Sequence, residues 1–198
     1  MGGENLRAVC IIGSPHSYGS TGIIIDSLVR GLKENDFTIK RYCLGESNIN
    51  YCLGCKQCYI NGECCQNDDV KSIVSDMLNA DLVVIGTPSY WGNVTGQLKV
   101  FFDRSTPYGD TNRNRKLIHT QKIYGVSISV RAGSTDRENI KIHDEITHYF
   151  GHLGIDVIER ISLRETDTVD DLLLKHQDKI EEAYLVGKKI KELIRTCD

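Results

Sequence analysis

The chain has 198 residues, of which 40% are hydrophobic and 26% charged, and its formal net charge is -3. A globular chain of this length buries about 70% of the surface that its unfolded form exposes, so it does not need disulfides for stability. The small negative charge gives no electrostatic reason to expect nucleic acid as a partner. The composition predicts a single domain over residues 1–198.

The first segment, MGGENLRAVCIIGS, runs almost directly into a short apolar stretch. It has no basic region, long apolar region or cleavage site of the kind that signal peptides carry. No stretch of the chain approaches the ~18 apolar residues of a membrane span. We therefore expect a cytoplasmic protein with no membrane partner. Structural disulfides are rare in that compartment, and clustered cysteines there more often bind metal or perform redox chemistry.

Apolar runs bounded by turn residues alternate with segments of helical spacing along the chain. Strands are expected at 7–13, 37–44, 81–88, 122–130 and 155–163, and helices at 21–35, 69–79, 96–104, 136–151 and 170–195. This alternation predicts an α/β fold: a doubly wound five-stranded parallel sheet of flavodoxin-like order 2-1-3-4-5. The last helix is expected to be continuous and to bury one stripe, formed by Leu173, Ile180, Tyr184, Ile190 and Ile194, with Gly187 filling a gap.

The loop after the first strand, GSPHSYGST at 13–21, places hydroxyl groups around a turn that opens into a helix. Ligands of open α/β sheets bind at the carboxyl ends of the strands, and the free N–H groups of a helix start suit a phosphate monoester. The loop lacks both the G-x-G-x-x-G pattern of dinucleotide sites and the Gly-Lys-Ser/Thr of a P-loop. The alternative is that Ser20 or Thr21 merely caps the helix.

Two further loops are expected at the same edge of the sheet. The segment TPSYWGNVTGQLK, 87–99, places a proline, two adjacent aromatic residues and Gly-Asn directly after a buried strand. Such a loop can border a flat ring, with N–H groups around Gly92 and Asn93 facing polar ring edges. The alternative makes Tyr90 and Trp91 core or interface aromatics. The segment VRAGST, 130–135, can approach the same ligand, so the three loops together describe a site for FMN, with its phosphate on the first loop.

Five cysteines lie in CLGCKQCYINGECC, 52–65, with the spacing C-x2-C-x2-C-x5-C. Gly54 and Gly62 allow the backbone to wrap inward, and short gaps in such a loop can supply three thiolates of a [4Fe–4S] cluster from one turn. Zinc held by four thiolates is an alternative, although zinc sites usually have two separated C-x2-C pairs. Free thiols or a redox disulfide are the third possibility.

The segments GSPHSYGST, TPSYWGNVTGQLKVFFDR and CLGCKQCYINGECCQNDDV resemble the signature segments of the iron–sulfur flavoproteins, in the NADPH-dependent FMN reductase branch of the flavodoxin-like superfamily. With the loop arguments, this resemblance implies these cofactor contacts: Ser14, His16, Ser20, Thr21, Pro88, Ser89, Tyr90, Trp91, Gly92, Asn93, Arg131 and Gly133. His16 stands where the family often has arginine. The implied cluster ligands are Cys52, Cys55, Cys58 and Cys64. Cys65 also fits the spacing, but the register of Asp68 and Asp69 favours Cys64.

The resemblance implies an electron-transfer oxidoreductase with bound FMN and a [4Fe–4S] cluster, and with NAD(P)H as a candidate electron donor. Flavin exchanges hydride or single electrons and a cluster exchanges one at a time, so no acid–base residue need be named. The expected partner is a one-electron carrier such as ferredoxin or a small-molecule acceptor. The alternatives are a cluster-free NAD(P)H reductase of flavins, quinones or nitroaromatics, and a non-enzymatic flavin redox sensor.

Two further expectations concern surface features. A cluster in a projecting loop, and the polar stretch at 105–120, predict a homodimer or homotetramer in which a second subunit covers the loop. Lys99, Asp103 and Arg104 are interpreted as charges at a helix end that pair or cap.

Overall fold

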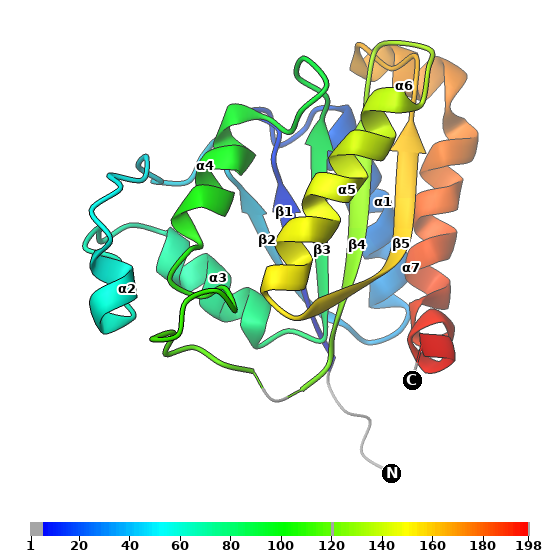
Figure 1. Ribbon diagram of the computed structural model, residues 1–198. Helices are drawn as coiled ribbons and strands as arrows, with labels where there is room; N and C mark the ends of the chain where they lie inside the picture. The colour runs from blue at the N-terminus through cyan, green and yellow to red at the C-terminus, as the bar shows by residue number, and fades with distance from the viewer. Residues whose placement is uncertain (1–5, 120, 198) are drawn as a thin grey trace.

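Five parallel strands form one sheet in the order β2-β1-β3-β4-β5 in the computed structural model, which describes residues 6–119 and 121–197 (Figure 1). The strands are β1 (Arg7–Ile12), β2 (Thr38–Cys43), β3 (Leu82–Pro88), β4 (Ile123–Val130) and β5 (Ile155–Leu163). This order confirms the predicted doubly wound sheet. β4 is buried along its whole length, as expected for an inner strand whose two faces are both covered by helices.

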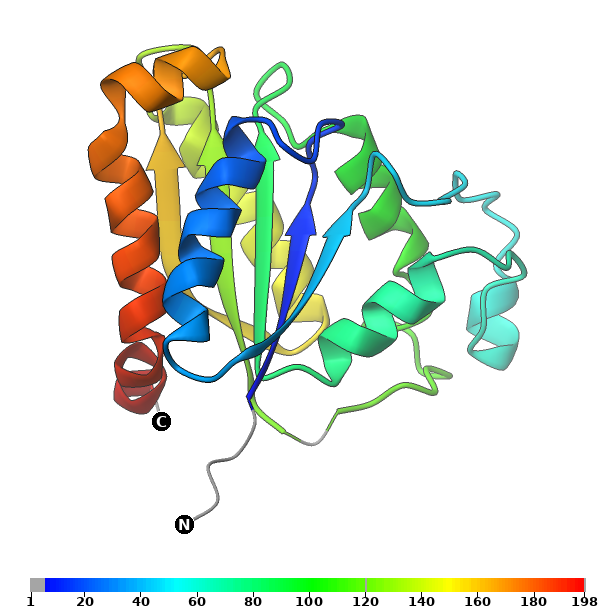
Figure 2. The same ribbon diagram turned by 180° about the vertical axis from the view of Figure 1, so that it is seen from behind.

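Helices cover both faces of the sheet. α3 (Val70–Leu78), α4 (Gly96–Arg104) and α5 (Arg137–His152) cover the face seen in Figure 1, and α1 (Ser20–Lys33) and α7 (Gln177–Cys197) cover the face seen in Figure 2. Successive residues of a strand point to opposite faces. In β1, Val9 and Ile11 accordingly pack with α3, α4 and α5, whereas Ala8, Cys10 and Ile12 pack with α1 and α7.

α1 and α7 approach each other closely through two glycines. A Cβ atom added to Gly187 would lie 2.1 Å from the Leu28 carbonyl oxygen, and one added to Gly31 would lie 2.2 Å from the Tyr184 carbonyl oxygen. No side chain larger than hydrogen fits at either position while the helices keep this spacing. Gly187 thus allows the helix contact, which the apolar stripe in the sequence did not indicate.

The predicted closing helix at 170–195 is wrong in its continuity. The chain forms α6 (Val169–Lys175), then leaves helical geometry at His176, where φ is -130° and ψ is 40°, and resumes in α7. Thr168 starts α6 with a capping box in which its side chain and that of Asp171 bond each other's backbone N–H. Because the break separates α6 from the stripe of α7, Leu172 is the buried residue of α6 and the predicted Leu173 is 43% exposed.

The segment between β2 and α3 carries the five clustered cysteines and is called the cysteine loop from here on. It projects at the side of the molecule and contains a short helix, α2 (Gln57–Asn61) (Figures 1 and 2). The sequence did not indicate this helix. Lys56 before it and Gly62 after it both have positive φ, so it is one isolated turn. In the described part of the chain, no helix combines the length and the apolar character that a bilayer crossing requires.

Candidate functional site

The loop between β1 and α1 presents a helix start without a side-chain cap. α1 begins after Gly19, which has no side chain, and Ser20 and Thr21 lie inside the helix rather than capping it. The Ser20 hydroxyl donates to the Thr168 carbonyl at 3.1 Å, and the buried Ser14 Oγ accepts from the backbone N–H of His16 at 3.1 Å. The first turn of α1 can therefore offer N–H groups and the positive end of the helix dipole to an anion.

A cavity of about 330 Å³ lies at the carboxyl ends of β1, β3 and β4. Eight of the predicted cofactor contacts line it: Ser14, His16, Ser20, Thr21, Pro88, Ser89, Tyr90 and Arg131. Thr166 and Asp167, between β5 and α6, also line the cavity. They were not among the predicted contacts. Their position directly after the fifth strand was the available signal, because all strands of a parallel sheet end at the same edge.

Arg131 lines the cavity, and its Nε–H group is a buried donor without an acceptor among the described residues. Its Nη1 donates to the Thr135 carbonyl at 2.6 Å, and its Nη2 lies 3.4 Å from Oε1 of Glu138. The other carboxylate oxygen of Glu138, Oε2, accepts from the Ser89 hydroxyl. Among the described residues, nothing accepts a hydrogen bond from the buried Nε. Gly133 leaves room for this arrangement, since an added Cβ would lie 2.1 Å from Arg131 Nη2. A buried N–H without a partner in a cavity wall suits an acceptor atom of a ligand.

The aromatic loop is a tight two-residue turn. The Tyr90 N–H donates to the Asn93 carbonyl at 3.0 Å, and the Asn93 N–H donates to the Tyr90 carbonyl at 3.1 Å. Trp91 and Gly92 between them have φ of 55° and 71°, the pattern of a type I′ turn. Of the N–H groups around Gly92 and Asn93 that were expected to face a ring, that of Asn93 is used by the turn. Trp91 is fully exposed and Tyr90 half-exposed, so neither belongs to the core.

The five clustered cysteines line one small cavity of about 30 Å³: Cys52, Cys55, Cys58, Cys64 and Cys65. Gly54 and Gly62 have φ of 63° and 77°, which confirms that glycines let this loop wrap inward. The Sγ atoms of Cys55 and Cys65 are 3.4 Å apart, and all the cysteines are unpaired by disulfides. Within residues 6–119 and 121–197, no three histidine, cysteine or acidic side chains converge closely enough to hold a metal ion.

The thiols in contact differ in how readily they ionise. A backbone hydrogen bond from Gln57, and then the contact with Cys65, lower the pKa of the Cys55 thiol. The same contact raises the pKa of Cys65. Burial raises the pKa of Cys58.

The polar stretch after α4 supports the cysteine loop of its own chain. The Asn112 side chain donates to the Cys58 carbonyl at 3.1 Å, and the Asn114 side chain donates to the Tyr59 carbonyl at 2.6 Å. A Cβ added to Gly62 would lie 2.0 Å from the Asn114 carbonyl oxygen, so the two segments touch through their backbones. This stretch was expected to reach a neighbouring subunit. Its Asn112 and Asn114 contact the cysteine loop of their own chain, and residue 120 lies outside the described residues.

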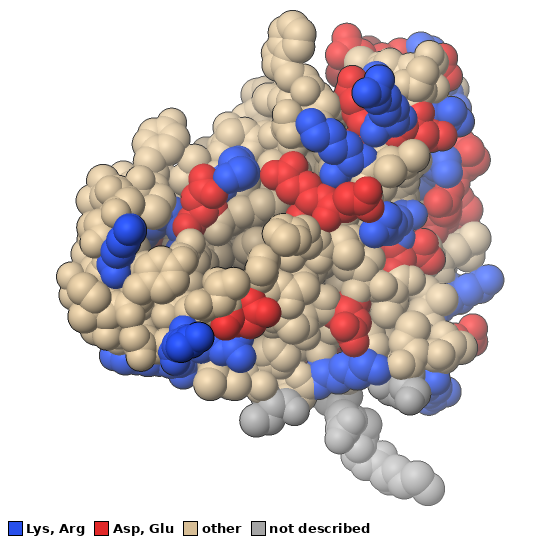
Figure 3. All heavy atoms as spheres, in the orientation of Figure 1, with Lys and Arg blue, Asp and Glu red and all other residues tan. Residues whose placement is uncertain are grey.

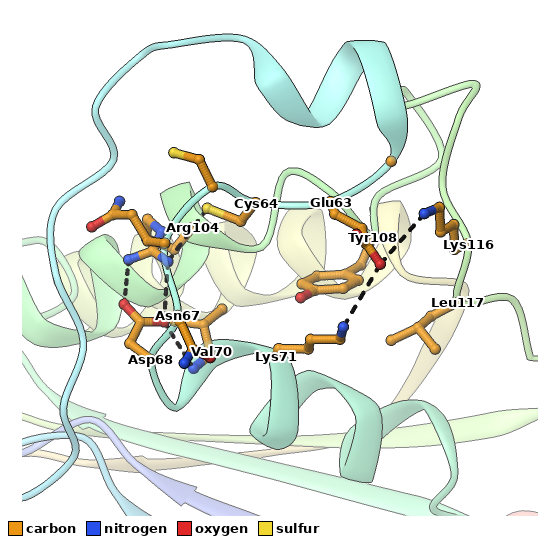
Figure 4. Close-up of a pocket in the computed structure, with 13 residues that line it drawn as sticks. Glu63, Cys64, Asn67, Asp68, Val70, Lys71, Arg104, Tyr108, Lys116 and Leu117 are labelled. Atoms are coloured by element: carbon orange, nitrogen blue, oxygen red, sulfur yellow. Dashed lines mark hydrogen bonds and ion pairs between the residues drawn. The ribbon is translucent and has the colours of Figure 1, made fainter.

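Arg104 ends α4 and pairs, as expected of a helix-end charge, but its partner is Asp68 at the base of the cysteine loop and both side chains are buried. Its guanidinium contacts both carboxylate oxygens of Asp68, at 2.6 and 3.0 Å (Figure 4). Burial alone would raise the pKa of Asp68, but the guanidinium holds it below its usual value. Lys99 and Asp103 on the same helix do form the expected exposed pair, at 2.5 Å. The burial of Arg104 depends on where the cysteine loop packs against α4. The spacing of residues along α4 gives no information about that packing.

α4 joins the two parts of the site. Thr95, its N-cap, accepts from the Leu98 N–H at 3.3 Å and donates its hydroxyl to the Gly13 carbonyl at the start of the first loop. Arg104 is the last residue of the same helix. One helix thus connects the cavity at the sheet edge to the base of the cysteine loop.

Known proteins match a large part of the chain in sequence. The family model described as NADPH-dependent FMN reductase matches residues 6–166. An iron-sulfur flavoprotein of Archaeoglobus fulgidus is 36% identical over 135 residues, which cover 68% of this chain and 59% of that protein. An iron-sulfur flavoprotein of Methanocaldococcus jannaschii is 39% identical over 100 residues, which cover 50% of each chain. The matched part of this chain therefore spans about half to three fifths of these relatives.

Solved structures share the fold at low sequence identity. An NAD(P)H:quinone oxidoreductase from Methanothermobacter marburgensis has a TM-score of 0.72 at 15% identity, with 94% of this chain and 96% of that one covered. An FMN-dependent NADH-azoreductase from Bacillus anthracis, solved in complex with FMN, has a TM-score of 0.65 at 15% identity, with 93% and 99% covered. At these identities the likeness shows the flavodoxin-like fold alone.

Proposed function

Because the chain belongs to the NADPH-dependent FMN reductase family, we propose that it is a flavin-dependent oxidoreductase that works with bound FMN. We also propose that the cysteine loop binds a [4Fe–4S] cluster. The protein would then couple a two-electron donor such as NAD(P)H to a one-electron partner such as ferredoxin, or to a small-molecule acceptor. The observation that carries the proposal is the cavity where predicted FMN contacts from three loops meet.

The residues around this cavity fit FMN. The first turn of α1 and the hydroxyls of Ser14, Ser20 and Thr21 suit its phosphate. The buried Nε of Arg131 can donate to an acceptor of the ring, and Tyr90 offers an aromatic face beside it. FMN supplies hydride and single-electron chemistry when bound. The residues of the chain bind and orient it, and the proposal needs no acid–base residue.

The rest of the predicted ring contacts have different roles in the proposal. Trp91, Gly92 and Asn93 form the turn that follows Tyr90 and do not line the described cavity. Gly133 lies under Arg131. We propose that these four residues shape the loops that hold the ring rather than contribute donors to it.

The donor set of the cysteine loop fits an iron–sulfur cluster. Five thiols line one cavity, and thiolates are the ligands that such clusters take. We propose Cys52, Cys55, Cys58 and Cys64 as the ligands. The names of the relatives support the cluster, and so do the two positive-φ glycines within the loop, which allow its backbone to wrap inward.

A cluster-free NAD(P)H reductase is the second candidate. The observation that favours it is that no three of the described cysteines converge as metal ligands. In this case the flavin cavity keeps its role and the cysteine loop is inert or binds zinc.

The cofactor content of anaerobically purified protein tests the two candidates. Heat-released flavin should be FMN; recovery of mostly FAD, or of no flavin after reconstitution, would contradict the proposed flavin site. The proposed cluster requires about four iron and four sulfide per chain. One zinc per chain, or no metal after reconstitution, would leave the cluster-free reductase.

Two matched cysteine variants test the ligand assignment. Replacing Cys55 with alanine should remove the iron and keep the FMN, because the flavin loops lie elsewhere. Replacing Cys65 with alanine should keep both. A cluster that survives loss of Cys64 but not of Cys65 would show that the neighbouring thiol is the fourth ligand.

We also propose that the protein is a homodimer or homotetramer. The cysteine loop carries several exposed apolar side chains, namely Tyr51, Leu53, Tyr59 and Ile60. A projecting cluster would be open to solvent, and burial in an interface protects such a centre and tunes its potential.

A further inference from the structure

One carboxylate holds both ends of the cysteine loop. The backbone N–H of Asn50 donates to Asp68 Oδ2 at 3.1 Å, and the backbone N–H of Val70 donates to Asp68 Oδ1 at 3.3 Å. Arg104 Nη1 donates to Oδ2 at 2.6 Å and to the Asn50 carbonyl at 2.6 Å, and Nη2 donates to Oδ1 at 3.0 Å. The loop that carries the cysteines therefore begins and ends on one ion pair.

The same guanidinium reaches a cysteine. Arg104 Nη2 lies 3.5 Å from the Sγ of Cys64, within reach of an N–H···S hydrogen bond (Figure 4). The Sγ of Cys65 instead lies against that of Cys55. The contacts therefore distinguish the two neighbours: Arg104 at the loop base reaches Cys64, whereas Cys65 contacts Cys55.

The ion pair is fully buried, which needs an explanation. The side chains of Arg104 and Asp68 are each 1% exposed. A buried ion pair is weak support for stability, since removing two charges from water costs about as much as their attraction returns. Breaking it, however, leaves one charge buried alone. A buried ion pair beside the Cys64 thiol is suited to holding that thiol in place and to setting the electrostatic potential around it.

We propose that Arg104 is a positioning residue for the cysteine loop: it fixes Cys64 as the fourth ligand and raises the reduction potential of the cluster through its hydrogen bond to that sulfur. The redox part of this inference rests on the proposed cluster. Reduction adds negative charge to the cluster, and a nearby N–H donor or positive charge stabilises the reduced form. Asp68 partly cancels the guanidinium charge, so the two residues act on the potential in opposite directions.

Because Arg104 and Asp68 should act on the reduction potential in opposite directions, variants of the two residues provide a test. A purely structural role for Arg104 predicts no such pair of opposite shifts. In anaerobic FMN- and iron-loaded protein, Arg104→Gln should disfavour cluster reduction at least tenfold, a shift of -59 mV for a one-electron couple. Asp68→Asn should favour reduction and shift the midpoint upward. The matched control Lys99→Gln removes a positive charge from the exposed side of α4 and should leave the midpoint unchanged. If both variants shift the midpoint in the same direction, or neither shifts it, the inference is overturned.

A second measurement needs no cluster. In metal-free protein, hydrogen exchange of the Asn50 and Val70 N–H groups should be at least tenfold faster in Arg104→Gln than in wild type, because the carboxylate that accepts both bonds is released. Unchanged exchange would overturn the positioning role. If Arg104→Gln does not fold, the double variant Asp68→Asn/Arg104→Gln removes both charges, and its midpoint should lie below that of Asp68→Asn; equal midpoints would overturn the inference.

The outcomes separate this inference from the proposed function. Wild-type protein that reconstitutes with FMN but without iron refutes the proposed cluster, and with it the redox part of the inference. Wild-type protein that carries iron, with Arg104→Gln at an unchanged midpoint and with unchanged exchange, refutes the inference alone.

Discussion

Ser20 lies in the first turn of α1, at the wall of the cavity and at the positive end of the helix dipole. A carboxylate at this position would stand beside the proposed phosphate. Two unit charges about 4 Å apart repel by about 4 kcal/mol at an effective dielectric constant of 20. We therefore expect Ser20→Glu to weaken FMN binding by at least about a hundredfold, measured by fluorescence titration of the apoprotein.

A control variant separates this effect from a general loss of stability. Ser72→Glu places the same charge in the first turn of α3, away from the cavity, and should leave FMN affinity unchanged. FMN binding of Ser20→Glu equal to that of wild type would show that the phosphate lies elsewhere.

His143 is enclosed between two serine hydroxyls in the interior, with Ser127 Oγ 2.7 Å from Nδ1 and Ser162 Oγ 2.9 Å from Nε2. Burial, and then the positive charge of Arg160, lower its pKa to about 4, with Asp144 opposing. The unfolded chain binds this proton below about pH 6.5, whereas the folded protein does so only near pH 4. Stability from this residue is therefore present above pH 6.5 and is lost as the pH falls.

We expect the free energy of unfolding of wild type to drop by up to about 3 kcal/mol between pH 6.5 and pH 4 because of His143. In His143→Gln this component is absent, so its stability should depend less steeply on pH over that range. Urea unfolding at a series of pH values measures both slopes. Parallel curves for the two proteins would mean that His143 is not kept neutral by its surroundings.

At the scale of elements, the contact between α1 and α7 depends on two glycines. Gly187→Ala would place a methyl group against the backbone of α1, and overpacking of this kind costs about 1–3 kcal/mol. Gly151, near the end of α5, has open space around its Cα. Gly151→Ala should instead be neutral or stabilising by up to about 1 kcal/mol, since alanine favours the helix. Thermal unfolding of both variants tests the contact; equal effects would contradict it.

The broken closing helix shows what the apolar pattern alone cannot indicate. The stripe from Ile180 to Ile194 predicted α7, and the segment before it has enough apolar residues to extend the same pattern. The start signal at Thr168 with Asp171 was present in the sequence. The sequence carried no signal for the break at His176, because the break depends on how α6 packs Leu172 into the core beside the sheet.

At the scale of the whole molecule, the exposed apolar residues of the cysteine loop predict self-association. The side of the molecule that carries this loop shows few charged side chains (Figure 3). Covering Leu53 and Ile60, which are exposed, would remove apolar area from water. We expect light scattering at micromolar concentration to give at least twice the mass of one chain. A monomeric mass over that range would contradict the prediction.

The sheet order and most cavity residues were predictable, because strand patterns are local and parallel strands end at one edge. Ser14, Ser20 and Thr21 follow from this rule without knowledge of side-chain contacts. Arg104 does not, since its role depends on contacts between segments far apart in the sequence. The turn at Trp91 and Gly92 was also missed: the residues were recognised as a loop, but the hydrogen bonds that close it occupy the N–H expected to face a ligand.

The length of α4 constrains which insertions the chain can accept. One residue added between Thr95 and Arg104 would turn the end of the helix by about 100° and advance it by about 1.5 Å, which would remove the guanidinium from Asp68. Aligned homologues should therefore keep a fixed number of residues along α4. Insertions and deletions, more than substitutions, should show that α4 sets the distance between the cavity at the sheet edge and the base of the cysteine loop.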